Sequence, residues 1–214
     1  MARPLFVIGM QRNGTTILTR LLCRHADCGL GRAGYEPFDR WDVPAIGELG
    51  GQATATPLLD GAGEYVKNCR KPFAVVRLAL PWAWESLAWP RLLDRFPDAL
   101  AVVTVRNGQD AYRSWRTLPY VQTLGVEQKA CHGGQEECAA LAWSYQCWAE
   151  AVRRSFSEAN EKYAGRVTPI EYEHLVCDAD GTLAPVWAAL GLEPLTGLQG
   201  MIRPPVHWSG GNGR

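Results

Sequence analysis

Residues 5–22 read LFVIGMQRNGTTILTRLL, and this stretch decides the fold on which the rest of the chain builds. Its apolar run 5–8 predicts a buried strand, residues 9–14 predict a tight loop, and residues 15–22 predict an amphipathic helix. Glycines at both ends of the loop let the backbone turn sharply, so that successive N–H groups and the helix start face one anion. We therefore expect a strand, loop and helix that hold a phosphate or a sulfate ester.

The loop differs from a nucleoside-triphosphate loop in one decisive residue. The spacing from Gly9 to Gly14 is that of such a loop, but Thr15 stands where a triphosphate loop has its lysine. A basic residue occurs inside the loop instead, at Arg12. The sequence therefore predicts a phosphate cradle without the lysine that contacts a γ-phosphate.

The segment GMQRNGTT, residues 9–16, resembles the 5′-phosphosulfate loop of the sulfotransferase family, commonly G-x-x-R/K-S-G-T-T. The departure is Asn13 in place of the usual serine. The resemblance implies that the donor is 3′-phosphoadenosine 5′-phosphosulfate and that Arg12 neutralises charge on the leaving phosphate and the transferring sulfuryl group. The loop residues expected to bind this donor are Gln11, Arg12, Asn13, Gly14, Thr15 and Thr16. Taken alone, the stretch also fits an ordinary strand-to-helix turn with a solvated arginine.

Length and composition predict one globular domain that covers residues 1–214. The chain is 47% hydrophobic and 21% charged, and 22 basic residues balance 22 acidic ones, so nothing indicates a nucleic-acid partner. No apolar run approaches a membrane span, and no signal-peptide pattern precedes the first strand, so we expect a soluble, cytoplasmic protein. The seven cysteines form no CxxC pair and are odd in number, which favours reduced thiols. Cys131, His132 and Cys138 lack paired ligand spacing, so no metal site is predicted.

A second anion-binding motif is expected after the apolar run 100–105, which predicts a strand that ends just before Arg106. Ligands of open α/β sheets bind outside the carboxyl ends of the strands. The segment VVTVRNGQDAYRSW, residues 102–115, resembles the family's strand followed by R-D-P-x-x-x-x-x-S, with Asn107 and Gly108 in place of Asp-Pro. An arginine fork and the Ser114 hydroxyl suit a second phosphate, although a surface ion pair for Arg106 and a solvent-facing serine remain an equal alternative. Arg77, at the end of another predicted strand (73–78), is a weaker candidate for the rim of the site.

A general base is expected in the long acceptor-side loop 29–60, which is rich in Gly, Pro and Ala. Within it, Pro37 biases Glu36 toward an extended conformation. The segment EPF, residues 36–38, resembles the carboxylate version of the family's general base, whereas without the resemblance a solvated loop glutamate is the better interpretation. Asp39 and Asp42, just past this segment, could substitute as the base if the loop folds differently. His25 and Asp27 are further alternatives, but at the end of the first helix we expect them to face solvent.

The remaining segments alternate between helix and strand. Helices are predicted at residues 84–96, 138–163 and 180–190, the last with Gly191 as its C-cap. A fourth strand is predicted at residues 167–170. It is followed by EYEHL, which resembles the family's Y-E-x-L segment. This alternation predicts an α/β fold: a doubly wound, mostly parallel sheet with helices on both faces. The basic, Gly-rich tail 203–214 resembles the loop that covers the donor, which implies contacts from Gly211 and Arg214; a disordered tail is an equal alternative.

These features together predict a P-loop-like sulfotransferase fold. The expected reaction moves a sulfuryl group to a hydroxyl or amine of a small-molecule, sugar or natural-product acceptor, without a metal. A small-molecule kinase of the same fold, with Asp110 or Glu36 as metal ligands, and a non-catalytic nucleotide-binding protein are the alternatives. The sequence leaves the acceptor and the oligomeric state open.

Overall fold

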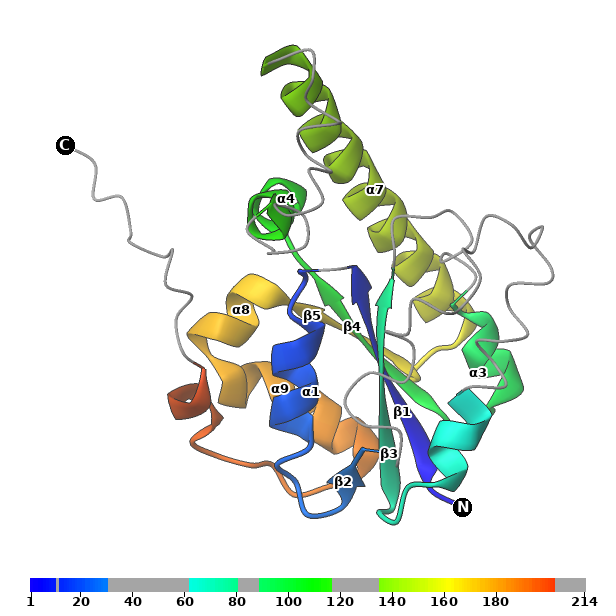
Figure 1. Ribbon diagram of the computed structural model, residues 1–214. Coiled ribbons are helices and arrows are strands. Elements are labelled where there is room, and N and C mark those ends of the chain that lie inside the picture. The colour runs from blue at the N-terminus through cyan, green and yellow to red at the C-terminus, as the bar shows by residue number, and fades with distance from the viewer. Residues whose placement is uncertain (11, 31–61, 81–88, 117–134, 203–214) are drawn as a thin grey trace.

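The computed structural model describes residues 1–10, 12–30, 62–80, 89–116 and 135–202. Their centre is a five-stranded sheet in the order β2-β3-β1-β4-β5, in which every neighbouring pair is parallel (Figure 1). The strands are β1 (Arg3–Met10), β2 (Cys28–Gly29), β3 (Phe73–Leu80), β4 (Leu100–Val105) and β5 (Val167–Glu171).

The three central strands are apolar along nearly their whole length. Residues 4–10 of β1 are buried, and so is every residue of β4, which is typical of parallel strands covered on both faces. The register pairs Val7 of β1 with Arg77 of β3 and with Val102 of β4. The predicted parallel α/β sheet is confirmed.

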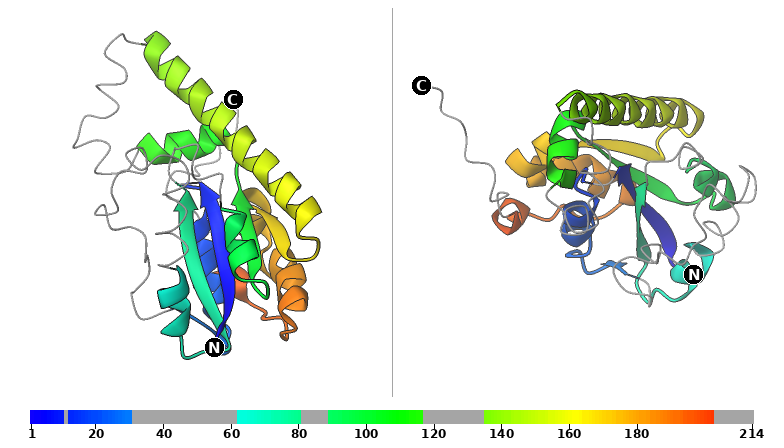
Figure 2. Two further views of the ribbon diagram at one scale, coloured as in Figure 1. Left: turned by 90° about the vertical axis from the view of Figure 1, so that its right-hand side faces the viewer. Right: turned by 45° about the horizontal axis from the view of Figure 1, so that its top comes forward.

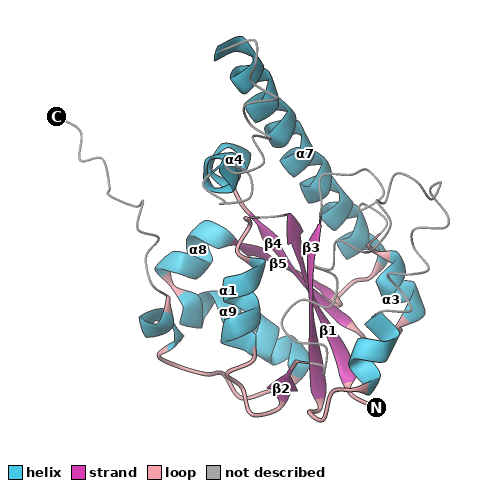
Figure 3. Ribbon diagram, in the orientation of Figure 1, coloured by secondary structure: helices cyan, strands magenta, loops and turns pink. Residues whose placement is uncertain are grey.

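Helices cover both faces of the sheet, as Figure 3 shows. One face packs against α1 (Thr15–Leu22), α8 (Tyr172–Cys177) and α9 (Ala179–Leu190), around a core that includes Leu18, Leu183 and Trp187. The other face packs against a helical segment at 62–67, α3 (Arg91–Arg95) and α7 (Gln135–Lys162), around a core that includes Phe6, Trp89 and Phe156. The chain ends its described part with the short 3₁₀ helix η3 (Leu198–Met201).

The topology places the functional end of the molecule. The chain reaches β2 and β3 on one side of β1 and then crosses to β4 and β5 on the other side, so the strand order reverses at β1. In such sheets the crevice at the carboxyl end of the switch-point strand is the ligand site. The loop after β1 lies at this end, and α4 (Gly108–Arg116) lies beyond the tips of the strands (Figures 1 and 2).

Several predicted boundaries need correction. β1 and β3 are longer than predicted, and the sequence analysis missed the edge strand β2 and the helix α8. The described helix before β4 begins only at Arg91, because Pro90 forms its N-cap; residues 84–88 of the predicted helix 84–96 lie outside the described part. Gly191 is the C-cap of α9, as predicted, with a left-handed φ of 69°. Within the described residues, no helix has both the length and the apolar character needed to cross a membrane.

Candidate anion-binding site

The start of α1 has backbone amides that no side chain caps. Gly14 is the N-cap residue, with φ 92° and ψ 12°, and no side-chain hydrogen bond caps the helix start within the described residues. A side chain at Gly14 would be strained, and its Cβ would also lie 2.4 Å from Cδ2 of Tyr172. The N–H groups of this turn therefore face the loop and can bind an anion, which the positive end of the helix dipole favours.

Asn13 holds the loop in shape. Its N–H donates to the carbonyl oxygen of Met10 at 3.2 Å, and its buried side-chain Nδ2 lies 3.4 Å from the carbonyl oxygen of Thr104 on β4. The loop is thereby tied to β1 and to β4. Because the Asn13 amide is engaged in this turn, the amides that can face an anion begin at Gly14.

Arg12 is held at both its side chain and its backbone. Its Nε donates to Oγ of Ser114 at 3.0 Å, and its carbonyl oxygen accepts from Nη1 of Arg106 at 2.8 Å. Arg12 is also the one non-glycine residue with positive φ, 68°, among the described residues. Such a backbone costs on the order of 1–3 kcal/mol and persists where the surroundings fix it. The two residues that the sequence assigns to a second phosphate therefore lie directly against the first loop.

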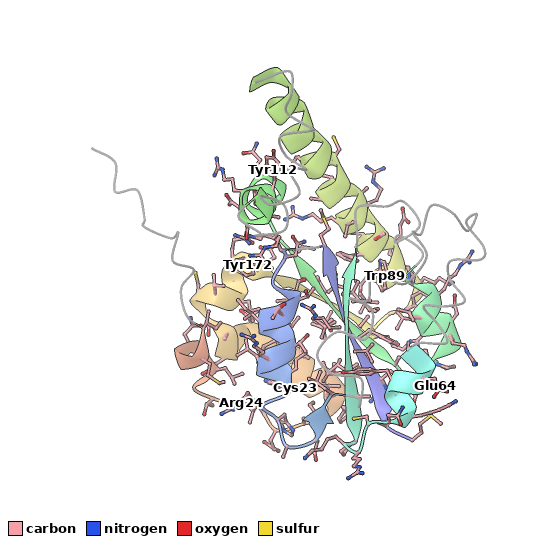
Figure 4. All side chains as sticks on the ribbon, in the orientation of Figure 1. Cys23, Arg24, Glu64, Trp89, Tyr112 and Tyr172 are labelled. Carbon is pink, nitrogen blue, oxygen red and sulfur yellow. The ribbon has the colours of Figure 1, made fainter. Side chains whose placement is uncertain are left out.

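Arg106 projects from the carboxyl end of β4 and stacks on an aromatic ring. Its guanidinium carbon lies 4.2 Å from the ring centroid of Tyr172, which is buried at the end of β5. Figure 4 labels Tyr172 near the loop end of α1, beneath Tyr112 of α4. The buried Nε of Arg106 has no hydrogen-bond partner among the described residues. Stacking fixes the plane of the guanidinium, and the Nε–H keeps unused hydrogen-bonding capacity.

Tyr172 was not among the predicted site residues, although the signal was present. It follows directly on β5, just as Arg106 follows directly on β4. Ligands bind outside the carboxyl ends of parallel strands, and this holds for β5 as it does for β4. The position of Tyr172 could therefore have been predicted by the same reasoning as that of Arg106.

The sequence analysis placed Arg77 at the end of a strand, but the residue lies inside β3. β3 continues to Leu80, and the Arg77 side chain is buried. Its Nη1 donates to Oγ1 of Thr16 on the first turn of α1. Arg77 therefore supports the start of α1 from below and adds positive charge under it.

Other predicted residues lie elsewhere. His25 and Asp27 lie past the far end of α1, where the His25 ring is 5.5 Å from Trp187 and the Asp27 carbonyl oxygen accepts from the N–H of Phe73 at the start of β3. Both residues thus lie at the amino ends of the strands, whereas the loop lies at the carboxyl ends. They cannot serve as the base at the loop. Several predicted residues lie outside the described part of the chain: Gln11, Glu36, Asp39, Asp42, Cys131, His132, Gly211 and Arg214. Among the described side chains, no group of three or more is arranged to hold a metal ion.

The arrangement gathers three arginines around one helix start. Arg12, Arg77 and Arg106 come from the loop, β3 and β4, and each has a hydrogen bond that fixes its direction. Positive charge held in place at a helix N-terminus suits a multiply charged anion, because the donors need little reorganisation when it binds.

A sequence model described as the sulfotransferase family matches residues 64–196, more than half of the chain. The chain belongs to the sulfotransferase family. The matched range includes Arg106, Ser114 and Tyr172, while the loop with Arg12 precedes it. A comparison with curated proteins found no match.

Solved sulfotransferase structures share this fold. The sulfotransferase from Alicyclobacillus acidocaldarius is 19% identical, with a TM-score of 0.56 over 96% of this chain and 88% of its own. The sulfotransferase domain from the curacin biosynthetic pathway is 14% identical, with a TM-score of 0.57 over 96% of this chain and 79% of its own. The sulfotransferase domain of the Synechococcus PCC 7002 olefin synthase is 16% identical, with a TM-score of 0.53 over 95% and 78%. At these identities the likeness establishes the P-loop-like sulfotransferase fold.

Proposed function

We propose that this protein transfers the sulfuryl group of 3′-phosphoadenosine 5′-phosphosulfate to a hydroxyl or an amine of a small-molecule, sugar or natural-product acceptor. The observation that carries the proposal is the meeting of Arg12, Arg106 and Ser114 at the uncapped start of α1. A donor with a sulfated 5′-phosphate and a separate 3′-phosphate has two anionic groups, and the site has two sets of donors for them.

The first set would hold the 5′-phosphate. It consists of the amides of residues 14–16 and the hydroxyls of Thr15 and Thr16. The Thr16 oxygen accepts a hydrogen bond from Arg77, so its own proton remains available to donate to a phosphate oxygen. Thr15 is buried, and its Cγ2 lies so close to Gly9 of β1 that a Cβ there would be only 3.0 Å from it.

The second set would hold the 3′-phosphate. Arg106 has a buried Nε without a partner among the described residues, and a planar guanidinium fits two oxygens of one phosphate. Ser114, whose oxygen accepts from Arg12 Nε, would add a hydroxyl contact to the same phosphate. The tail residues Gly211 and Arg214 are proposed to cover this end of the donor.

The transfer itself needs a base and a stabilised leaving group. The acceptor oxygen forms a bond to sulfur while the bond from sulfur to the 5′-phosphate oxygen breaks, and the acceptor proton passes to the carboxylate of Glu36. Negative charge grows on the leaving phosphate, next to which Arg12 would stand. By analogy with phosphoryl transfer, catalysis would then rest on positioning and charge neutralisation.

Competition between donors tests the proposal. We expect 3′-phosphoadenosine 5′-phosphate to bind more tightly than ATP in calorimetry without added metal, because the loop lacks the triphosphate lysine and offers a second phosphate site. Transfer of labelled sulfate to a panel of acceptors then measures activity. ATP binding that is tighter and depends on magnesium would instead favour the kinase, and tight binding without turnover would favour a nucleotide-binding protein.

Glu36→Gln tests the assignment of the base. The amide keeps the shape of the side chain but cannot accept the proton, so we expect turnover to fall by at least about a hundredfold. Binding of 3′-phosphoadenosine 5′-phosphate should stay at the parental level. Near-parental turnover in this variant would move the assignment to Asp39 or Asp42, because His25 and Asp27 lie at the opposite end of the strands.

A further inference from the structure

The turn that leads from Arg106 into α4 is built differently from the Asp-Pro turn that the family commonly has, and both of its residues make specific contacts. Asn107 is the cap of α4: its Oδ1 accepts from the N–H groups of Gln109 at 3.0 Å and Asp110 at 3.3 Å. Its own N–H donates to Oε1 of Glu173 on α8 at 3.3 Å. These bonds fix the direction in which α4 leaves the sheet.

Gly108, the first residue of α4, lies where α4 touches α7. In Figure 2, α4 meets the upper part of α7 just beyond the tips of the strands. Gly108 is buried, and a Cβ built on it would lie 2.4 Å from Oε1 of Gln146, 3.0 Å from Cα of Gln146 and 3.2 Å from Cβ of Ala149. The side-chain oxygen of Gln146 can move away, but its Cα is part of the backbone of α7. The glycine is needed here for space, since any larger residue forces the helices apart.

The distance between these helices bears on the anion site. Ser114 lies less than two helical turns after Gly108 on the same helix, and its Oγ is 3.0 Å from Nε of Arg12. Ala111 and Tyr112 are buried between them, so this part of α4 is packed along its length. A displacement of about 0.5 Å would take the hydrogen bond out of its normal range. The backbone of Arg12 belongs to the loop, which the contacts of Asn13 hold to β1 and β4, and it would not follow α4.

We propose that Gly108 is a positioning residue: it seats α4 against α7 and thereby sets the contact of Ser114 with Arg12. Its role in donor binding rests on the function proposed above, whereas its effect on the Arg12 side chain does not. Gly108 touches neither phosphate group itself. Its influence therefore passes through α4 to Ser114.

The first measurement needs no donor. The Nε–H resonance of Arg12 in the NMR spectrum reports its hydrogen bond to Ser114, so we expect it to shift in Gly108→Ala as it shifts in Ser114→Ala. Gln109→Ala, on the exposed side of the same turn, is the matched control and should leave it in place. An unchanged Arg12 resonance in a folded Gly108→Ala protein would overturn the proposal.

The second measurement uses 3′-phosphoadenosine 5′-phosphate and 5′-AMP in calorimetry. Gly108→Ala should weaken the first ligand about fivefold, the net effect of roughly one hydrogen bond, and leave 5′-AMP nearly unchanged. In a Ser114→Ala background the same change should add nothing, because interacting positions are not additive. Additive losses, or equal losses for both ligands, would contradict the proposal. Failure of the parent to prefer the 3′-phosphorylated ligand would count against the proposed function, while the Arg12 resonance would still decide the role of Gly108.

Two further variants separate positioning from folding. Gln146→Ala removes the closest atom that the new methyl group would meet, so Gly108→Ala/Gln146→Ala should recover part of the lost affinity. Ala149→Ser adds an atom on the α7 side of the same contact. It should produce the same selective loss of affinity for the 3′-phosphorylated ligand, although no residue of α4 is substituted. This variant decides the question if Gly108→Ala does not fold. A folded Ala149→Ser protein with parental affinity for both ligands would refute the role of this helix contact.

Discussion

Arg106 combines two functions in one side chain. Nη1 donates to the Arg12 carbonyl oxygen at 2.8 Å, and the guanidinium stacks on Tyr172 with its Nε buried. The first contact supports the left-handed backbone of Arg12, and the second holds the fork in the plane in which it would meet a phosphate. Loss of this side chain should therefore affect ligands according to whether they carry a 3′-phosphate.

Arg106→Ala should weaken 3′-phosphorylated ligands by about 1.5–3 kcal/mol, the usual value of a hydrogen bond to a charged group. Binding of 5′-AMP should change much less, since only the support of the Arg12 backbone is lost. Arg113→Ala is the matched control, because this arginine is exposed on α4 and pairs with Asp110. Calorimetry with both ligands provides the measurement. Equal losses of affinity for the two ligands would show that Arg106 does not bind the 3′-phosphate.

At the scale of elements, α3 is held to the end of α7 by a small polar cluster. The Tyr163 hydroxyl donates to Oδ1 of Asp94 at 2.7 Å, and Lys162 Nζ lies 3.3 Å from the same oxygen. Arg166 donates to the carbonyl oxygens of Leu93, Phe96 and Pro97 at the end of α3. A cavity of about 350 Å³ lies beside this cluster, between α3 and α7. These contacts explain how the short α3 stays in place.

The same cluster predicts a pH dependence of stability. The hydrogen bond from Tyr163, with a smaller contribution from Lys162, lowers the pKa of Asp94 below its ordinary value. The folded state therefore prefers the carboxylate, and its contribution to stability is present above the unfolded pKa and is lost as the pH falls through the folded pKa. Because Asp94 is half exposed, we expect this contribution to stay below about 1 kcal/mol.

Asp94→Asn tests this prediction in chemical unfolding experiments. The variant should be less stable than the parent at about pH 6, and the difference should shrink as the pH falls below about 4, the ordinary pKa of an aspartate, and through the lowered folded pKa. Glu64→Gln, which alters an exposed carboxylate paired with Lys67, serves as the control. A stability difference that is constant over this range would mean that Asp94 acts through packing rather than through its charge.

At the scale of the whole molecule, the reactivity of the cysteine thiols indicates whether the sheet is intact. Burial raises the pKa of Cys28 on the edge strand β2 to about 12 and that of Cys23, just after α1, to about 11. Neighbouring thiols contribute less in both cases, and Asp27 also contributes at Cys28. Cys147 and Cys177 are exposed on α7 and α8. Since the thiolate is the reactive form, the buried Cys28 thiol should react only when the fold opens.

Alkylation with iodoacetamide at about pH 8, followed by mass spectrometry, measures this difference. We expect Cys147 and Cys177 to react at least about tenfold faster than Cys28 in the native protein, because few buried thiols are ionised. In denaturant the rates should become similar, which is the internal control. Rapid modification of Cys28 under native conditions would show that β2 opens without global unfolding.

The local part of the fold was predictable because it depends on neighbouring residues. The apolar runs that form β1, β3, β4 and β5 and the helical periods of α1, α7 and α9 were visible as sequence patterns, and so were the glycines of the loop. β2 was missed, since two residues carry no period, and α8 was missed because it follows a strand without a break. Arg77 was misplaced because the end of a buried strand is set by its neighbours in the sheet.

The sequence by itself determined the class of fold, the loop that opens it, and the types of residue at the ends of its strands. Only the tertiary structure decided which of them meet. Arg12 and Ser114 are 102 positions apart, and their contact exists because β1 and β4 are adjacent and α4 packs on α7 through Gly108. Side-chain chemistry and periodicity are written locally in the chain, whereas a distance of a few ångströms between remote residues depends on how closely whole helices and strands pack.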